Sequence, residues 1–199
     1  MLDHAHRKGH ISQVHIFFPL KGFKKGGQHE QAPLSFDEEN NLIENAASTM
    51  HAALFAYALD TGVRPGEAVS LHWEDITWGA SEGADWGKVY VRGTKTRESL
   101  ATLPLGPRSS SRLADLHRDN GHPESGPVFV WHGKSIKSFR RALTRSAARA
   151  GIERAVNRYL LRHTMATRLT SRGLAVEDVA RVMRHTNPRM VQERYDHSD

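Results

Sequence analysis

The sequence predicts a mainly helical fold with one small antiparallel β-sheet, and three observations lead to this α+β class. Apolar residues recur at helical spacing along most of the chain from residue 35 onward. Alternation of apolar and polar residues is confined to two short neighbouring segments, 88–92 and 99–105. A chain of 199 residues is also long enough to bury one substantial core.

The first residues differ in character from the rest of the chain. Residues 1–33 are expected to form a basic, flexible tail or linker, because Lys21–Gly27 is rich in lysine and glycine. Histidines near this end have no acidic or cysteine partner at a recognised ligand spacing, so they favour a tail over a metal site. One folded domain is expected over residues 34–199.

The first helices are predicted from their end signals. Ser35 and Glu38 form the pattern of a capping box, which opens a helix. An alanine-rich helix is expected over Thr49–Leu59. Gly62 is placed to end that helix in a left-handed conformation, and Pro65 is placed in the first turn of the next one.

The two alternating segments predict a β-hairpin. Lys88–Arg92 and Ser99–Leu105 are the expected strands, and Lys95 lies near the tip of the polar turn between them. Residues 128–130 predict a short buried segment. Further helices are expected over 107–119, 135–150, 158–171, 176–183 and 188–196.

Composition excludes several classes of protein. With no cysteine, the chain has neither a disulfide framework nor a thiolate metal site. No apolar run reaches the length of about 18 residues that a membrane span needs, and the N-terminus has no apolar signal-peptide core. The cytoplasm is therefore the expected location.

The net charge of +6 is unevenly distributed along the chain. Residues 1–132 carry 13 basic and 16 acidic side chains, whereas residues 133–195 carry 15 basic and 4 acidic ones. Thirteen of those 15 basic residues are arginine, whose planar guanidinium binds phosphate oxygens with two parallel hydrogen bonds. This block favours a nucleic acid as partner over a set of solvated helix faces.

Four segments carry candidate chemistry, and each is weak by itself. Arg64 lies at a helix start, where backbone amides favour an anion, although a structural ion pair with Glu67 explains it better when it is taken alone. Lys95, at the hairpin tip, is by default an exposed surface lysine. The other two segments are 159–167, with the letters YLLRHTMAT, and 182–197, which ends in RYDH.

In this order and spacing, the four segments resemble the tyrosine recombinase (phage integrase) family, and specifically its C-terminal catalytic domain. The resemblance implies that Arg64 and Arg162 clamp the scissile phosphate of DNA. It also implies that Lys95 is the general acid and that Tyr195 is the nucleophile. His185 would hydrogen-bond the phosphate or orient Tyr195.

Such an enzyme would be a site-specific DNA recombinase that acts through a covalent 3′-phosphotyrosyl intermediate. The resemblance implies double-stranded DNA as substrate, a tetramer of protomers on two duplexes, no cofactor and no metal, and association with the nucleoid when DNA is bound. Two alternatives remain open at this point. One is a non-catalytic DNA-binding module of the same fold, and the other is strand relaxation of the type IB topoisomerase kind.

The chain departs from the family pattern at several positions. Tyr159 stands where the family has a histidine, and a phenol cannot act as a base near neutral pH as imidazole can. Arg184 replaces a glycine, and the interval from His185 to Tyr195 is one residue longer than usual. Relatives also carry an N-terminal core-binding domain, so weak, salt-sensitive DNA binding is expected of this part alone.

Overall fold

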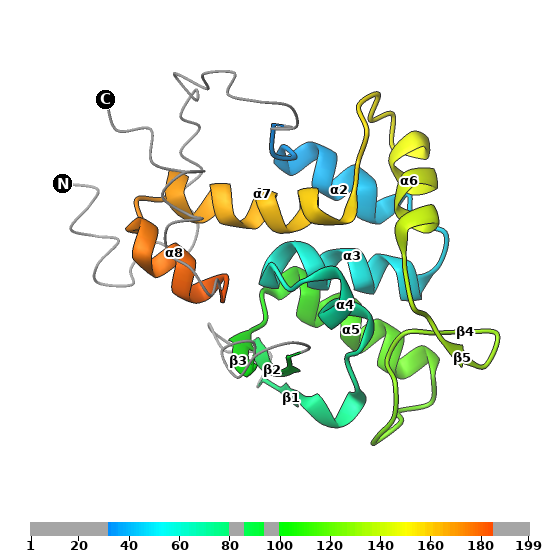
Figure 1. The fold of residues 1–199 in the computed structure, drawn as a ribbon. Helices are drawn as coiled ribbons and strands as arrows, with labels where there is room; N and C mark the ends of the chain where they lie inside the picture. Colours follow the sequence, from blue (N-terminus) through cyan, green and yellow to red (C-terminus); the bar gives the residue numbers. More distant parts are fainter. Residues whose placement is uncertain (1–31, 80–85, 94–99, 185–199) are drawn as a thin grey trace, which may run out of the picture. The chain divides into compact units, whose positions relative to one another are not determined.

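The structure, a computed structural model, describes residues 32–79, 86–93 and 100–184 (Figure 1). Helices pack around one central helix, and a three-stranded sheet and a two-stranded ribbon complete this part of the chain. In chain order the elements are α2 (Phe36–Glu44), α3 (Thr49–Thr61), α4 (Pro65–Val69), the 3₁₀ helix η1 (Trp73–Asp75), β1 (Ile76–Trp78), β2 (Gly87–Arg92), β3 (Leu100–Pro104), α5 (Pro107–Asp119), β4 (Val130–Trp131), β5 (Lys134–Ser135), α6 (Arg140–Arg149), α7 (Arg158–Ser171) and α8 (Val176–Val182).

The predicted end signals of the first helices are confirmed, although α3 continues two residues past the expected Leu59, to Thr61. The Ser35 amide donates to Glu38 Oε2 at 2.8 Å, and the Glu38 amide donates to Ser35 Oγ at 3.1 Å, which is the reciprocal capping box. Gly62 ends α3 in the left-handed region, with φ of 61°. Pro65 is the first residue of α4. These ends depend on bonds between residues no more than a few positions apart, which is why the sequence predicts them.

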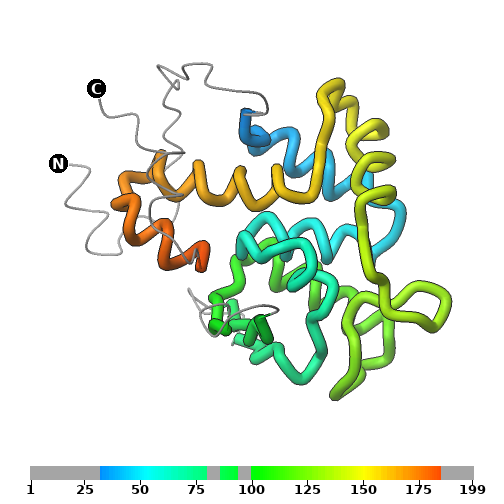
Figure 2. Tube along the Cα trace, in the orientation of Figure 1, coloured from blue at the N-terminus to red at the C-terminus, as the bar shows by residue number. Residues whose placement is uncertain are grey.

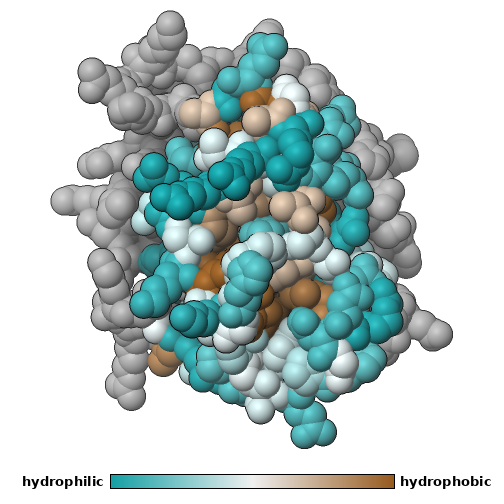
Figure 3. Space-filling view, turned by 90° about the vertical axis from the view of Figure 1, so that its right-hand side faces the viewer, coloured by the Kyte–Doolittle hydropathy of each residue, from teal (hydrophilic) through white to brown (hydrophobic). Residues whose placement is uncertain are grey.

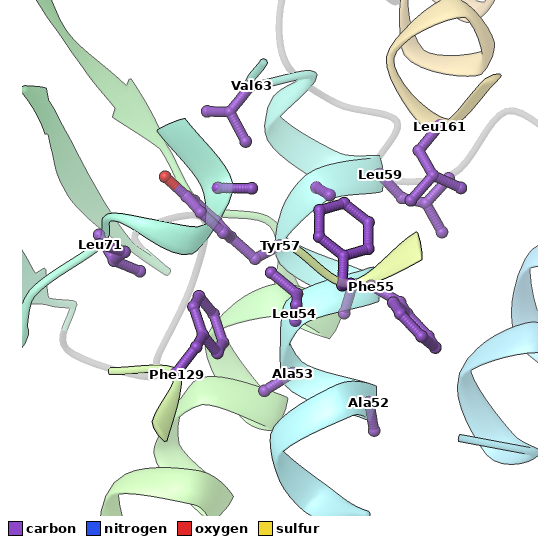
Figure 4. Packing of buried hydrophobic residues seen from close by; sticks show 14 of the residues in the cluster. Ala52, Ala53, Leu54, Phe55, Tyr57, Leu59, Val63, Leu71, Phe129 and Leu161 are labelled. Atoms are coloured by element: carbon purple, nitrogen blue, oxygen red, sulfur yellow. The ribbon is translucent and has the colours of Figure 1, made fainter. Parts of the chain in front are cut away.

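Helix α3 forms the centre of the hydrophobic core. Most of its residues are buried, and they face other elements on several sides (Figure 4). Tyr57 stacks on Phe129 with ring centroids 6.3 Å apart, and Phe55 lies 6.3 Å from Phe139. Truncating a large side chain in such a core costs about 3–5 kcal/mol of stability. This packing holds the C-terminal end of α3, beside which the candidate site is built.

The sheet has the order β1-β2-β3, with both pairs antiparallel. The predicted hairpin is confirmed in its described part, where Val89 pairs with Leu103 and Tyr90 with Thr102. Side chains of β2 alternate between buried and exposed, as the sequence pattern predicts. Strand β1 and the ribbon of β4 and β5 were not predicted, because strands of two or three residues are too short to show alternation.

Two predictions near the ribbon are corrected. The helix expected over 135–150 begins only at Arg140, because Ser135 pairs with Val130 in the ribbon instead. The segment expected to be buried is buried at Val128 and Phe129, whereas Val130 is 37% exposed. By contrast, α5 and α7 have the predicted bounds, and α8 ends one residue earlier than expected.

Gly62 allows the last described helices to approach α3 closely. A Cβ atom at this position would lie 2.8 Å from Met183 Cε and 3.1 Å from Met165 Cγ, and the positive φ also disfavours a side chain. The chain trace shows α8 ending beside the C-terminal end of α3 (Figure 2). Ala166 and Val179 join Met183 in a small second hydrophobic cluster that holds α7 and α8 together.

Candidate active site

Arg162 is the most buried of the arginines predicted to bind phosphate. It lies in α7 and is 7% exposed. Its Nη1 donates to the Gly62 carbonyl at 2.5 Å, and its Nη2 donates to the Met183 carbonyl. One guanidinium therefore joins the C-terminal ends of α3 and α8, where unsatisfied carbonyls concentrate negative partial charge.

Arg64, the N-cap residue of α4, also contacts the chain directly after α8. Its Nη2 donates to the Arg184 carbonyl at 2.5 Å. Its Nη1 lies 3.0 Å from Glu67 Oε1, so the ion pair that the sequence favoured for this arginine is present. The Arg64 side chain remains 31% exposed, so it is accessible to a ligand at the surface.

A third guanidinium completes the group. Arg184 Nη2 donates to Glu67 Oε2 at 2.8 Å, and both side chains are almost fully buried. Arg64, Glu67, Arg162 and Arg184 are called the arginine cluster below. Three positive charges and one negative charge give this cluster a net charge of +2. An anion such as a phosphodiester matches the fork of guanidinium donors that these arginines present.

Tyr57 lies in α3, close enough to the cluster to experience its charges. Burial raises the pKa of its phenol, and the positive charge of Arg184 opposes this effect only in part. The Tyr57 phenol therefore stays neutral and adds no negative charge to the arginine cluster.

The remaining predicted site residues fall outside the described part of the chain. These are Lys95, His185 and Tyr195. Lys95 belongs to the segment between β2 and β3, and His185 directly follows Arg184 in the sequence. Their roles therefore stay predictions.

Tyr159, which stands where the resemblance implies a histidine, is in the first turn of α7. The preceding Asn157 caps this helix through its side chain, which accepts from the Tyr159 and Leu160 amides at 2.9 and 3.0 Å. Tyr159 is 65% exposed, in contrast to Arg162 one turn later. At the surface, the phenol can donate a hydrogen bond to an incoming phosphate but cannot replace an imidazole as a base.

Sequence reasoning missed that Arg184 is part of the cluster. Position 184 was noticed only because it departs from a glycine in the family pattern. The structure shows that its backbone has φ of 54° and that its guanidinium reaches Glu67. No local sequence signal predicts this contact, because the two residues are far apart in the chain and nothing in either segment marks them as partners.

Two features are absent from residues 32–79, 86–93 and 100–184. No three His, Asp or Glu side chains among them are grouped as a metal site would require. None of the helices in these ranges combines the length and the apolar character of a transmembrane helix.

The chain is similar to known integrases and recombinases. The profile of the phage integrase family matches residues 32–199. The prophage integrase IntR of Escherichia coli (strain K12) is 28% identical over 233 residues, which cover 98% of this chain and 54% of IntR. A XerC-like tyrosine recombinase of Caldanaerobacter subterraneus subsp. tengcongensis is 26% identical, over 81% of this chain and 49% of that protein. The chain thus spans about half the length of these relatives.

Solved structures of recombinases share the fold. The crystal structure of XerA recombinase matches with a TM-score of 0.70 at 23% identity, over 86% of this chain and 61% of that one. The catalytic domain of bacteriophage HP1 integrase matches with a TM-score of 0.60 at 20% identity, over 84% and 88%. XerH site-specific recombinase bound to its difH substrate matches with a TM-score of 0.64 at 18% identity, over 80% of this chain and 48% of that one.

Proposed function

The chain belongs to the phage integrase family, and we propose that it is a site-specific DNA recombinase whose nucleophile is Tyr195. The observation that carries the proposal is the convergence of Arg64 and Arg162. They come from distant parts of the sequence, yet they donate to the adjacent carbonyls of Arg184 and Met183. A phosphate held between two guanidiniums at the surface is the arrangement that phosphoryl transfer needs.

The proposed reaction begins when the Tyr195 phenolic oxygen attacks the scissile phosphorus. A P–O bond to tyrosine forms while the P–O5′ bond breaks, which leaves a 3′-phosphotyrosyl link. The phenol gives its proton to water as the new bond forms, and Lys95 donates a proton to the departing 5′-oxygen. A 5′-hydroxyl from a second duplex then attacks the link and releases Tyr195. In the return step, the attacking 5′-hydroxyl gives its proton to Lys95, and Tyr195 recovers a proton from water. Because the link conserves the energy of the phosphodiester bond, rejoining consumes no ATP.

The two arginines act on the transition state in this proposal. Negative charge grows on the non-bridging oxygens as the phosphorus becomes five-coordinate, and Arg64 and Arg162 would neutralise it. Removing one such preorganised donor costs about 2.7–4 kcal/mol in enzymes where this has been measured. His185 would hydrogen-bond the same phosphate or orient Tyr195.

The surface of α6 supports DNA as the substrate. Arg140, Arg141 and Arg145 are exposed, and among the described residues no carboxylate forms an ion pair with any of them. The first turn of α6 also contains no acidic residue. The face on the α6 side of the molecule is largely hydrophilic (Figure 3). Uncompensated arginines of this kind are suited to phosphate oxygens along a duplex.

The proposal extends to the organisation of the chain and its partners. Residues 34–199 would be the catalytic domain, and residues 1–33 a basic linker before it. Exchange between two duplexes by this chemistry requires four protomers, one for each strand that is cut. Other copies of the protein are therefore the proposed partners on DNA.

A DNA-binding module of the same fold that has lost strand cleavage is the second candidate. The observation in its favour is Tyr159, a phenol at the position where the family pattern has an imidazole. Relaxation of supercoiled DNA without exchange is a further outcome of the same chemistry, and it would appear as plasmid relaxation without recombinant products.

A nicked suicide substrate tests strand cleavage. After attack, the short strand with the new 5′-hydroxyl diffuses away, so the protein stays covalently attached to DNA and migrates slowly on a denaturing gel. We expect wild type to form this adduct with a panel of nicked duplexes carrying the target sites of related integrases. Tyr195→Phe should form none while binding the same DNA. Adduct formation by the Phe variant would show that another residue is the nucleophile, and DNA binding without adduct by wild type would favour the second candidate.

A further inference from the structure

We propose that Arg184 is a positioning residue of the site, which takes one oxygen of Glu67 and so keeps the charge of Arg64 available for the scissile phosphate. The inference rests on the proposed function. It concerns Arg184, which stands where the family pattern has a glycine and to which the resemblance assigns no role. Three features of position 184 carry it, namely its backbone, its side chain and its carbonyl.

The backbone of Arg184 is in a conformation that side chains disfavour. Its φ of 54° lies in the left-handed region directly after α8, where glycine or asparagine is the usual residue. For a residue with a Cβ atom this conformation is strained, whereas glycine adopts it readily. An arginine kept at such a position must be compensated by contacts of its side chain.

The side chain of Arg184 makes that contact with Glu67. Arg184 Nη2 and Glu67 Oε2 are 2.8 Å apart, and the two side chains are 4% and 1% exposed. Glu67 Oε1 is used separately, by Arg64 at 3.0 Å. The carboxylate is therefore divided between two guanidiniums. Glu67 Oε2 also accepts from the Arg64 main-chain amide at 2.9 Å. Without Arg184, the carboxylate would be shared with no second guanidinium in this cluster, and it would cancel more of the charge of Arg64.

The carbonyl of Arg184 contacts Arg64 from the other side. It accepts from Arg64 Nη2 at 2.5 Å, while Arg64 Nη1 is directed to Glu67. One residue thus influences the Arg64 guanidinium both through its main chain and, by way of Glu67, through its side chain. The adjacent Met183 carbonyl accepts from Arg162, so the same turn positions both predicted phosphate ligands.

Three variants separate charge from shape at this position. Arg184→Met removes the charge and keeps an unbranched side chain. Arg184→Lys keeps the charge on a similar stem. Arg184→Gly removes the side chain but relaxes the left-handed backbone, so it provides a variant that folds if Arg184→Met does not. Arg181→Met is the matched control, because Arg181 lies three residues before Arg184, in α8, and is exposed, with an ion pair to Asp178 on the surface.

The first measurement is single-turnover cleavage of the suicide substrate with protein in excess, together with the Kd for uncleaved DNA. Removing a residue that supports a functional group from behind typically costs about 10- to 100-fold in activity. We expect Arg184→Met and Arg184→Gly to lose cleavage in that range with little change in DNA Kd. Arg184→Lys should recover most of the rate, and Arg181→Met should cleave like wild type.

The second measurement needs no catalysis. Inorganic phosphate should raise the Tm of wild type and of Arg181→Met by binding the cluster. The increase should be smaller in Arg184→Met and Arg184→Gly, and it should be kept in Arg184→Lys. A variant that is only less stable would have a lower Tm without phosphate, but phosphate would raise its Tm by as much as it raises that of wild type.

The outcomes separate the two proposals. Suppose that wild type forms no adduct, but that phosphate raises the Tm of Arg184→Met less than that of Arg181→Met. The proposal of strand cleavage then fails, and the positioning role of Arg184 stands. If wild type forms adduct and Arg184→Met cleaves and responds to phosphate like wild type, the positioning role is overturned. Equal impairment of Arg184→Lys and Arg184→Met would also overturn it, because the charge would then be irrelevant.

Discussion

In the part of the chain that the structure describes, two buried carboxylates each bind two arginines, and they differ in how their charge is balanced. Glu39, in α2, accepts from Arg108 at 2.9 Å and from Arg168. Arg108 also bonds Asp60 at 2.5 Å, so this group has two positive and two negative charges. It is called the Glu39 cluster below. The arginine cluster around Glu67 has three positive charges and one negative charge.

The proposed function assigns different roles to the two groups. The Glu39 cluster joins α2, α3, α5 and α7, and its charges neutralise one another within the protein. Burial still weakens the charged form of Arg168, whose pKa is lowered to about 10, and its guanidinium lies 4.6 Å from the Phe36 ring centroid. The four side chains of the arginine cluster carry more positive than negative charge, and one of them, Arg64, is partly exposed. Under the proposed function, similar contacts would serve stability in one place and phosphate binding in the other.

The largest effect is expected from breaking the Glu39 cluster. Glu39→Leu leaves Arg168 buried without its carboxylate, and removing one partner of a buried ion pair costs about 3–5 kcal/mol of unfolding free energy. Denaturant unfolding measures this loss. The matched control is Glu44→Leu in the same helix, where an exposed pair with Arg112 is lost and about 0–1 kcal/mol is expected. Equal losses in the two variants would show that the Glu39 cluster contributes no more than a surface pair.

The next effect concerns the arginine cluster and should appear in catalysis. Arg162→Met is expected to slow cleavage of the suicide substrate by about 10²–10³-fold, because one donor to the transition state is lost. DNA affinity should change much less, which band-shift titration measures. Arg172→Met, an exposed arginine directly after α7, serves as control. If binding and cleavage fall by the same factor, Arg162 is an ordinary phosphate contact and the contrast between the two clusters is lost.

A smaller loss of stability is expected from a change at Gly62, whose backbone carbonyl binds Arg162 at the end of α3. Gly62→Ala places a Cβ atom 2.8 Å from Met183 Cε in a left-handed conformation, and that conformation alone costs about 1–2 kcal/mol. Thermal unfolding should show this loss.

Gly66→Ala is the matched control for that change. Nothing lies within 4 Å of a Cβ atom at Gly66, and the residue is in a helix, so a gain of about 0.4–1 kcal/mol is expected. If Gly62→Ala left the Tm unchanged, the junction of α3 and α8 would adjust easily to the added Cβ atom. That result would weaken the claim that close approach there positions Arg162.

Local features of this fold were determined by the sequence itself. The capping box at Ser35, the turn at Gly62 and the bounds of α5 and α7 were all predicted correctly. Each depends on hydrogen bonds or periodicity within a few residues, and such signals are written in consecutive positions. The order of the motifs also identified the family, and through that resemblance it predicts Arg64 and Arg162 as site residues.

Only the tertiary structure decided how these residues are connected. The contacts of Arg162 with Gly62 and Met183, and of Arg184 with Glu67, join segments that are far apart in the chain. No periodicity or end signal encodes such a pairing, because it depends on how helices pack and which carbonyls their ends leave unsatisfied. The sequence therefore names the arginines, and packing around α3 decides which carboxylate and which carbonyls they share.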